Sequence, residues 1–193
     1  KLDLISMMAH SQSTSEMQPI QFIGNLVLLL VGGYDTTKNS MSGGLLALSE
    51  NPDQWARLRS DGALIPSLIG EIIRYQTPII HMCRTATRHV EFNGQNIRER
   101  DRVVLWYISG NRDKSEIDCP DKFIIDRPKP HKHLSFGAGI HRCVGDRLAT
   151  LQLRILWEEI LRENLMIDVV GLPTRQYSNF INGISHLPVR IHG

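Results

Sequence analysis

A glycine-rich stretch that ends at a single cysteine, directly before a long helical pattern, constrains this chain most. The stretch runs from Phe136 to Gly145 and contains Cys143, after which leucine and isoleucine recur at helical spacing to Glu163. A helix N-terminus offers free N–H groups and the positive end of the helix dipole, which stabilise a thiolate. Glycines allow a tight turn and the close approach of a large flat ligand. The pattern favours a reactive thiolate at Cys143, and the alternative is an inert buried cysteine.

The composition indicates one ordinary globular domain in a reducing compartment. The chain has 193 residues, a net charge of +2 and three cysteines without paired spacing, so a disulfide framework is not expected and a cytoplasmic location is. So small a charge gives no argument for a nucleic-acid partner. The longest apolar run, Leu26 to Val31, is far shorter than the roughly 20 residues that span a bilayer, so no membrane span is expected.

Hydrophobic periodicity predicts a mainly α-helical chain with a minor β-sheet. The expected helices cover residues 2–9, 18–50, 53–59, 64–75 and 144–163. The first half of 18–50 is apolar nearly all round and is expected to be a buried helix. Short runs of β-branched and aromatic residues between 79 and 110, with Asn93-Gly94 as a turn, predict strands and a hairpin. Residues 111–142 are expected to be irregular, and the tail after Gly171 to form short strands and turns.

Four motifs resemble those of the cytochrome P450 family and follow the family's order. Phe136 to Gly145 resembles the haem-binding signature Phe-x-x-Gly-x-x-x-Cys-x-Gly. Gly32 to Thr37 resembles the oxygen-activation motif, and Glu71 to Arg74 resembles the Glu-x-x-Arg helix motif. Asn111 to Asp113 and Phe123 to Pro128 resemble the approach to the meander. The resemblance implies that residues 1–193 are the C-terminal part of one P450 domain. Because the chain starts at Lys1 within an apolar pattern, the N-terminal part is expected to be absent. Residues 22–31 should therefore expose apolar surface if residues 1–193 are made alone.

The resemblance also implies a cofactor and the residues that hold it. The cofactor is haem b (iron protoporphyrin IX), with Cys143 as the axial thiolate and metal ligand. Arg84 and His141 match positions that bind the haem propionates. The remaining cofactor-binding residues come from the signature itself, namely Phe136, Gly137, Arg142 and Gly145.

Asp35 and Thr36 are the predicted catalytic pair, which by resemblance delivers protons to dioxygen. We expect the Thr36 hydroxyl to bond back to the Gly32 carbonyl and open the helix there. Glu71 and Arg74 share a helix face and are expected to pair with each other. The resemblance implies that Arg127 joins them in a network that holds the fold.

Closer resemblance is to the soluble bacterial P450 subgroup that hydroxylates terminal methyl groups of alkanes and fatty acids. It implies O2 as co-substrate, with ferredoxin and ferredoxin reductase as electron donors, and a basic patch of Arg142, Arg147 and Arg154 would attract the ferredoxin. The apolar substrate pocket would be formed by Leu29, Leu30, Gly32, Gly33, Ile79, Ile80, Met82, Phe180 and Ile181. Tyr34 and Cys83 depart from the subgroup, which leaves the substrate chain length open. The alternatives are a steroid side-chain hydroxylase, a non-catalytic haem-binding fragment and a purely structural helical module.

Overall fold

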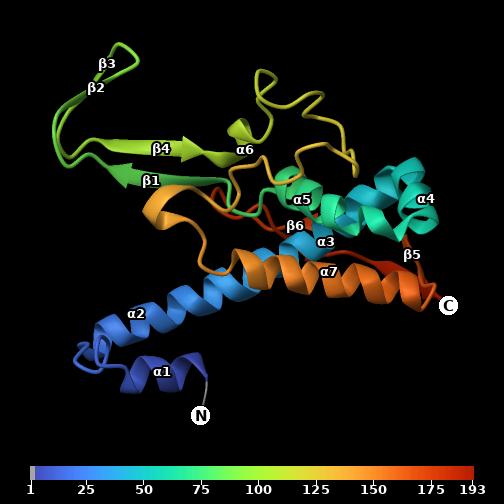
Figure 1. Cartoon of the computed structure of the whole chain (residues 1–193), viewed down its shortest axis with the longest axis horizontal. Helices are drawn as coiled ribbons and strands as arrows, with labels where there is room; N and C mark the ends of the chain where they lie inside the picture. Colours follow the sequence, from blue (N-terminus) through green and yellow to red (C-terminus); the bar gives the residue numbers. More distant parts are fainter. Residues whose placement is uncertain (1–2) are drawn as a thin grey trace.

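The computed structural model describes residues 3–193, which form a helical body with four small two-stranded antiparallel sheets at its edges (Figure 1). The predicted fold class, mainly α with minor β, is therefore confirmed. Leu2, part of the predicted helix 2–9, lies outside the described residues. The helices are α1 (Leu4–His10), α2 (Pro19–Leu30), α3 (Thr36–Glu50), α4 (Pro52–Ser60), α5 (Ile65–Gln76), α6 (Tyr107–Gly110) and α7 (Asp146–Arg162), with short turns η1 (Val31–Asp35), η2 (Gly62–Leu64) and η3 (Gly139–His141).

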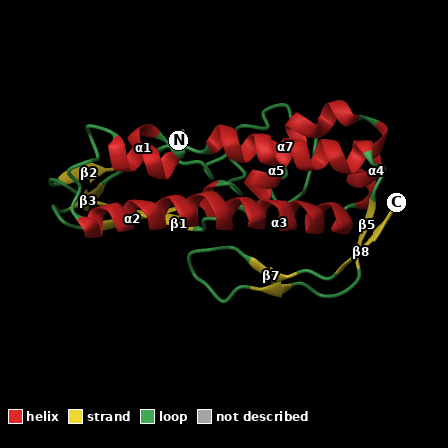
Figure 2. Cartoon of the chain, turned by 90° about the horizontal axis from the view of Figure 1, so that it is seen from below, coloured by secondary structure: helices red, strands yellow, loops and turns green. Residues whose placement is uncertain are grey.

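A rod made of α2, η1 and α3 runs along the molecule and replaces the single helix predicted over 18–50 (Figure 2). Its middle segment, η1, is a π-helical turn, which widens the helix by one residue. Pro19 starts α2 at its first turn, and the rod ends at Asn51, where Pro52 begins α4. The sequence therefore marked both ends of the rod correctly, and the opening predicted between Gly32 and Thr36 is confirmed, whereas its π-helical form was not predicted.

The core lies between α3, α5 and α7, far from α1. Leu68 and Trp157 are fully buried, and Trp157 packs edge-on against Trp55 of α4 with ring centroids 5.8 Å apart. Close contact between the helices depends on glycine: a Cβ added at Gly44 would lie 2.6 Å from Cδ1 of Ile72 in α5. The densely packed part of the fold thus consists of α5, α7 and α3, the C-terminal half of the rod.

The strands form four antiparallel pairs, some between neighbours in the sequence and some between strands farther apart. β1 (His81–Thr85) pairs with β4 (Arg102–Trp106), and between them β2 (Val90–Phe92) and β3 (Gln95–Ile97) form the predicted hairpin. Asn93 and Gly94 both have positive φ, 48° and 73°, as a two-residue primed turn requires. The tail forms β6 (Thr174–Arg175), β7 (Ile184–His186) and β8 (Val189–His192), with β6 paired to β7.

Three predictions of local structure need correction. β5 (Met166–Val169) precedes the predicted strand region and pairs with β8, and the short α6 was not predicted. The helix predicted from Val144 begins at Asp146, because Gly145 occupies the N-cap position with non-helical backbone.

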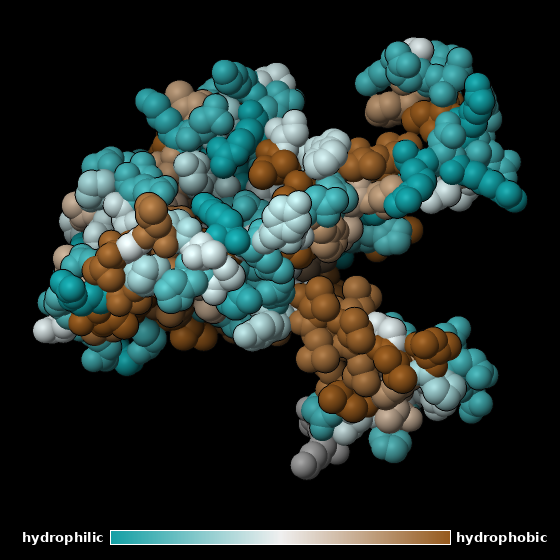
Figure 3. Space-filling view, turned by 180° about the vertical axis from the view of Figure 1, so that it is seen from behind, coloured by the Kyte–Doolittle hydropathy of each residue, from teal (hydrophilic) through white to brown (hydrophobic). Residues whose placement is uncertain are grey.

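The α1–α2 arm exposes its apolar side chains. The burial expected of this helix is not seen, whereas the exposure predicted for 22–31 in residues 1–193 alone is confirmed. No residue of α2 is buried by the described part of the chain, and Leu28 and Leu30 are 69% and 68% exposed. Figure 3 shows apolar side chains gathered along this arm. The predicted burial is therefore not provided by residues 3–193. No helix in this part of the chain has both the length and the apolar character needed to cross a bilayer.

Candidate haem site

The loop before α7 presents the Cys143 thiol on its surface. The backbone N–H of Cys143 donates to the Phe136 carbonyl at 2.8 Å, which closes the loop into a tight hairpin. Gly137 and Gly139 have φ of 66° and 68°, a region that glycine occupies at little cost. At Gly145 an added Cβ would lie 3.9 Å from Cys143 Sγ, in ordinary van der Waals contact, so Gly145 lies directly beside the sulfur. The glycines of the signature thus shape the loop and leave the thiol accessible.

Apolar side chains beside the thiol project away from the protein. Ile140 is 96% exposed and Val144 95%, and Leu148 in the first turn of α7 is 60% exposed. Apolar groups grouped on a surface around one reactive atom are typical of a ligand site. A flat apolar macrocycle placed over this loop would cover these side chains, and its metal could bind Cys143 Sγ. The residues of this loop therefore fit haem.

The three basic side chains predicted to bind the cofactor differ in whether a carboxylate already pairs with them. Arg84 on β1 donates to the Cys83 carbonyl at 3.0 Å and has no carboxylate partner within 4 Å among residues 3–193. His141 is exposed on η3. Arg142 already binds Asp146 at 2.7 Å. Arg84 and His141 are thus available to a propionate, whereas Arg142 would have to share its carboxylate.

The π-helical turn opens the rod at the motif predicted to activate oxygen. The Thr36 hydroxyl donates to the Gly32 carbonyl at 2.7 Å, as predicted. No heavy atom lies within 4 Å of a Cβ added at Gly32 or Gly33, so this side of the turn is open. The Asp35 carboxylate binds Lys38 at 2.8 Å, and this hydrogen bond raises the pKa of the Lys38 ammonium. The Asp35 side chain is only 23% exposed and is held by a cation rather than free in solvent.

A cavity of about 400 Å³ connects this turn with α7. Its lining includes Gly33, Tyr34 and Met41 from the rod and Gln152 from α7. Gln152 lies six residues after the start of α7, or about 9 Å along the helix axis. The cysteine loop, which leads into the start of α7, therefore lies on the same side of α7 as the α2–η1 segment, as Figure 1 shows. The fold brings the two predicted halves of the site, thiol and π turn, to the same end of the α3–α7 pair.

A buried ion-pair network holds the irregular segment against α5. Glu71 accepts from Arg74 through both oxygens, at 2.7 and 2.8 Å, and from Arg127 Nε at 2.9 Å. The Arg74 guanidinium also donates to the carbonyls of Asn111 and Pro120, each at 2.8 Å. The Glu71 and Arg74 side chains are 0% and 2% exposed. The three residues of the predicted network meet, and they bind main chain more than solvent.

Asn111 is a site residue whose role the sequence did not reveal. Its amide donates to Thr77 Oγ1 and Ser135 Oγ, each at 2.8 Å, and its Oδ1 accepts from the Leu134 N–H at 2.6 Å. The side chain is fully buried. Asn111 thus joins the end of α5 to Leu134 and Ser135, the residues that lead into the cysteine loop. Its place in the Asn-Arg-Asp motif was the available signal.

The residues predicted to form the substrate pocket fall into two groups. Ile79 and Ile181 form an isolated antiparallel bridge, and the Ile80 N–H donates to the Phe180 carbonyl at 2.9 Å. Met82 follows in β1. The other group, Leu29, Leu30, Gly32 and Gly33, belongs to α2 and the π turn. The first group forms one continuous wall, which is called the 79–82/180–181 wall below.

The predicted basic patch is partly neutralised. Arg142 pairs with Asp146, and Arg154 pairs with Glu158 at 2.6 Å. Arg147 is exposed and has no acidic partner within 4 Å in the described chain. Paired surface charges produce a weaker field than free ones, so Arg147 contributes most of the local positive potential.

His133 is a buried histidine just before the cysteine loop. Burial, followed by the charges of His131, Arg142 and Arg74, lowers the pKa of His133 from 6.5 to about 4. Its Nδ1 is buried without a hydrogen-bond partner, and its ring packs edge-on against Phe136 at 5.3 Å. The folded protein therefore holds this imidazole neutral at neutral pH.

This burial predicts that the protein loses stability in mild acid. Between pH 6.5 and about 4 the unfolded chain protonates His133 and the folded chain does not, so the free energy of unfolding falls as the pH falls through this window. The loss contributed by this residue reaches at most about 3 kcal/mol near pH 4. Denaturant unfolding from pH 7.5 to 4 should show a shallower loss in His133→Gln. His89→Gln, at an exposed position, is the control. An equal pH slope in all three proteins would contradict the prediction.

The fold and the site together define a haem-thiolate protein. Comparison with known proteins agrees: residues 2–167 match the family model of cytochrome P450. The chain belongs to the cytochrome P450 family. It is 52% identical to the structure of cytochrome P450-153 from Novosphingobium aromaticivorans, with a TM-score of 0.95, covering 98% of this chain and 48% of that one. The family's cofactor is haem b with an axial cysteine thiolate.

Two curated relatives show the range of named activities. The chain is 40% identical to linalool 8-monooxygenase from Pseudomonas putida over 97% of its own length and 46% of that protein's. It is 36% identical to steroid C26-monooxygenase from Mycolicibacterium smegmatis, covering 97% of this chain and 47% of that protein. The chain spans about half the length of the relatives that it matches.

Proposed function

We propose that this chain is the C-terminal part of a haem-thiolate monooxygenase that hydroxylates an unactivated C–H bond of an apolar substrate. The observation that carries the proposal is the accessible Cys143 thiol in its glycine loop, ringed by the outward-facing Ile140 and Val144. The overall reaction converts R–H, O2, two electrons and two protons into R–OH and water. Family membership and the names of the relatives support it.

The haem, when bound, supplies oxygen activation at an iron whose electron density the thiolate raises. Cys143 would hold the metal, and Arg84 and His141 would hold the propionates. Gly32 and Gly33 leave open space beside the π turn, where dioxygen would fit. The Thr36 hydroxyl donates its one hydrogen to the Gly32 carbonyl, so its oxygen would accept a hydrogen bond from, and position, a water molecule that gives up a proton into that space. Asp35 restores the proton, exchanging it with solvent beside Lys38.

We further propose the terminal methyl of a medium-chain alkane or fatty acid as the site of hydroxylation. The apolar 79–82/180–181 wall and the 52% identity to a P450-153 structure support this choice. The steroid C26-monooxygenase relatives support a second candidate, the terminal carbon of a steroid side chain. We propose a ferredoxin with its reductase as the electron donor, which would dock beside the exposed Arg147.

A spectrum and a product assay test the proposal on the protein made from its complete coding sequence. The reduced protein with carbon monoxide should show the Soret band of thiolate-ligated haem. Octane, a fatty acid and cholest-4-en-3-one should then be offered with a ferredoxin system, and products analysed by mass spectrometry. A terminal alcohol from the first two supports the main candidate, and one from the third alone supports the second. A protein that binds no haem would refute the proposal.

Replacing Thr36 should separate oxygen consumption from product formation. Thr36→Val keeps the shape of the side chain and removes the hydroxyl, so proton delivery fails after electrons have been taken up. A positioned proton donor contributes roughly 10²–10⁴ in rate, and product formation should fall at least about tenfold while NADH consumption continues. Thr36→Ser, which keeps the hydroxyl, should restore product. Equal product per NADH in Thr36→Val and the parent would contradict the assigned role.

A further inference from the structure

Two chain segments distant in sequence form the wall proposed to face the substrate, and their backbones are directly bonded. The Ile80 N–H donates to the Phe180 carbonyl, and the Asn182 N–H donates to the Pro78 carbonyl, both at 2.9 Å. Ile79 and Ile181 lie opposite each other between these bonds. The 79–82 segment runs into β1 and is held by its pairing with β4, whereas residues 180–182 belong to no strand in the described chain, so the tail half of this short pairing needs support from outside itself.

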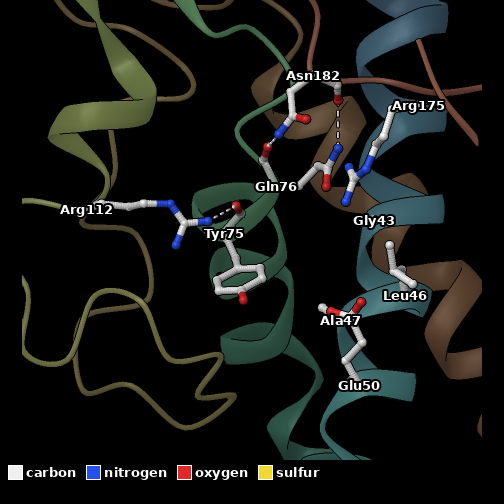
Figure 4. A pocket seen from close by; sticks show the side chains of 9 residues that line it. All are labelled: Gly43, Leu46, Ala47, Glu50, Tyr75, Gln76, Arg112, Arg175 and Asn182. Carbon is white, nitrogen blue, oxygen red and sulfur yellow. Dashed lines mark hydrogen bonds between the residues drawn. The ribbon is translucent and has the colours of Figure 1, made fainter. Parts of the chain in front are cut away.

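That support is a reciprocal pair of side chains at the base of the wall. Gln76, the last residue of α5, donates from Nε2 to the Asn182 carbonyl at 2.7 Å, and the Asn182 amide donates back to the Gln76 carbonyl. Figure 4 shows both bonds, with the two amides crossing between the helix end and the tail. Each side chain thus binds the other residue's main chain. We call this pair the Gln76–Asn182 clamp.

The helix side of the clamp is rigid. Gln76 is 6% exposed, and a Cβ added at Gly43 in α3 would lie 2.2 Å from its Oε1, so α3 closes directly over the amide. Thr77, the next residue, has φ of 43° and donates from its hydroxyl to the Arg74 carbonyl at 2.6 Å. Asn111 binds the same hydroxyl. The end of α5 is therefore fixed by its packing against α3 and by the hydrogen bonds of Thr77.

The tail side of the clamp has few other attachments. Tyr177 is fully exposed and Asn179 is exposed, so the turn before the wall is open to solvent. Beyond the wall, the Ile184 N–H donates to Asn39 Oδ1 of α3 at 2.9 Å. Residues 182 and 184 are thus held by amide side chains of α5 and α3, and without the clamp only backbone bonds and Ser178 would fix Phe180 and Ile181.

We propose that Gln76 and Asn182 are positioning residues that set the separation of the two halves of the 79–82/180–181 wall, and so determine which substrate carbon is hydroxylated. Neither residue needs to touch the substrate. The proposal rests on the proposed function, since it assigns the wall to the substrate cavity. A terminal methyl is selected only when the wall is narrow enough to exclude the bends that present an internal carbon, and a loosened tail admits those bends.

Isosteric substitutions test the clamp in the haem-loaded protein made from its complete coding sequence. Gln76→Glu and Asn182→Asp each replace an amide donor by a carboxylate oxygen facing a carbonyl. Asn51→Asp is the matched control, because Asn51 also donates from Nδ2 to a carbonyl, that of Ala47 at 2.7 Å, but at the C-terminal end of α3 and without a bond to the tail. The first readout is the ratio of terminal to internal alcohol from a linear substrate. The second is amide hydrogen exchange at Ile80 and Asn182, which does not depend on activity.

Both clamp variants should exchange these amides roughly tenfold faster, as expected for one lost hydrogen bond. Their terminal-to-internal product ratio should fall at least about threefold, and Asn51→Asp should keep both values of the parent. A destabilised variant with faster exchange but an unchanged product ratio would overturn the specificity role, as would unchanged exchange. If the parent protein forms no haem-thiolate complex, the proposed function fails, whereas the exchange measurement still decides whether the clamp fixes the wall.

Discussion

Cys143→Ala is expected to abolish the thiolate signature of the reduced carbon monoxide complex and to reduce hydroxylation to background. The sulfur is the one thiol of the loop, and neither an alanine methyl nor a neighbouring imidazole can reproduce thiolate ligation. The fold should survive, because the Cys143 side chain is exposed and its structural bond is made by the backbone N–H to Phe136. Absorption spectra and product yield measure the effect, and far-ultraviolet circular dichroism monitors the fold.

Cys83→Ala is the matched control for this substitution. Cys83 is half-buried on β1, and its Sγ contacts only the Arg84 carbonyl at 3.7 Å in the hydrogen-bond pattern of the described residues. This variant should keep the thiolate band and the activity. A thiolate band that persists in Cys143→Ala, or disappears in Cys83→Ala, would assign the iron to a different ligand.

Glu71→Ala is expected to cost about 3–5 kcal/mol of folding free energy, because it leaves two buried or half-buried arginines without their counter-ion. Domains of this size are stable by only about 5–15 kcal/mol, so much of the protein should fail to fold at 37 °C. The Ile124 N–H, which donates to Glu71 Oε1 at 2.8 Å, loses its acceptor as well. Urea unfolding followed by circular dichroism measures the change.

Glu158→Ala provides the comparison within the same protein. Glu158 pairs with Arg154 at 2.6 Å, but both side chains are about half exposed, at 42% and 57%. Exposed pairs of this kind contribute at most about 1 kcal/mol. If the two variants lost equal stability, the claim that burial makes the Glu71 network important would be wrong.

The sequence predicted those parts of the fold that have a local signal. Pro52 and the Asn93-Gly94 pair marked a helix start and a hairpin, and the bond from Thr36 to Gly32 followed from a hydroxyl four residues after a glycine. The π turn follows from the same bond but had no separate signal in the periodicity. The exposure of α2 had no signal in the segment itself, because an apolar segment does not reveal whether its partner surface is present in the same chain. It was expected only from the resemblance to part of a P450 domain.

The residues of the candidate site likewise divide into those that a local motif reveals and those that depend on distant contacts. Cys143 and its glycines form one contiguous motif, so the sequence could identify them together. The roles of Asn111 and of the clamp could not be predicted, because each depends on side chains that meet residues 23 to 106 positions away. Polar residues that bind main chain over such distances look, in sequence, like ordinary loop or helix-end residues.

The bonds from Arg74 and Arg127 to main-chain carbonyls have a consequence for the order of folding. The segment from 111 to 142 has almost no regular hydrogen bonding of its own, and the carbonyls of Pro120, Cys119 and Lys122 accept from these two guanidinium groups instead. Because Arg74 and its partner Glu71 belong to α5, that segment should become ordered once α5 has formed. The cysteine loop lies at its end, so the nascent chain should acquire a haem-competent thiol late, after its helical core is complete.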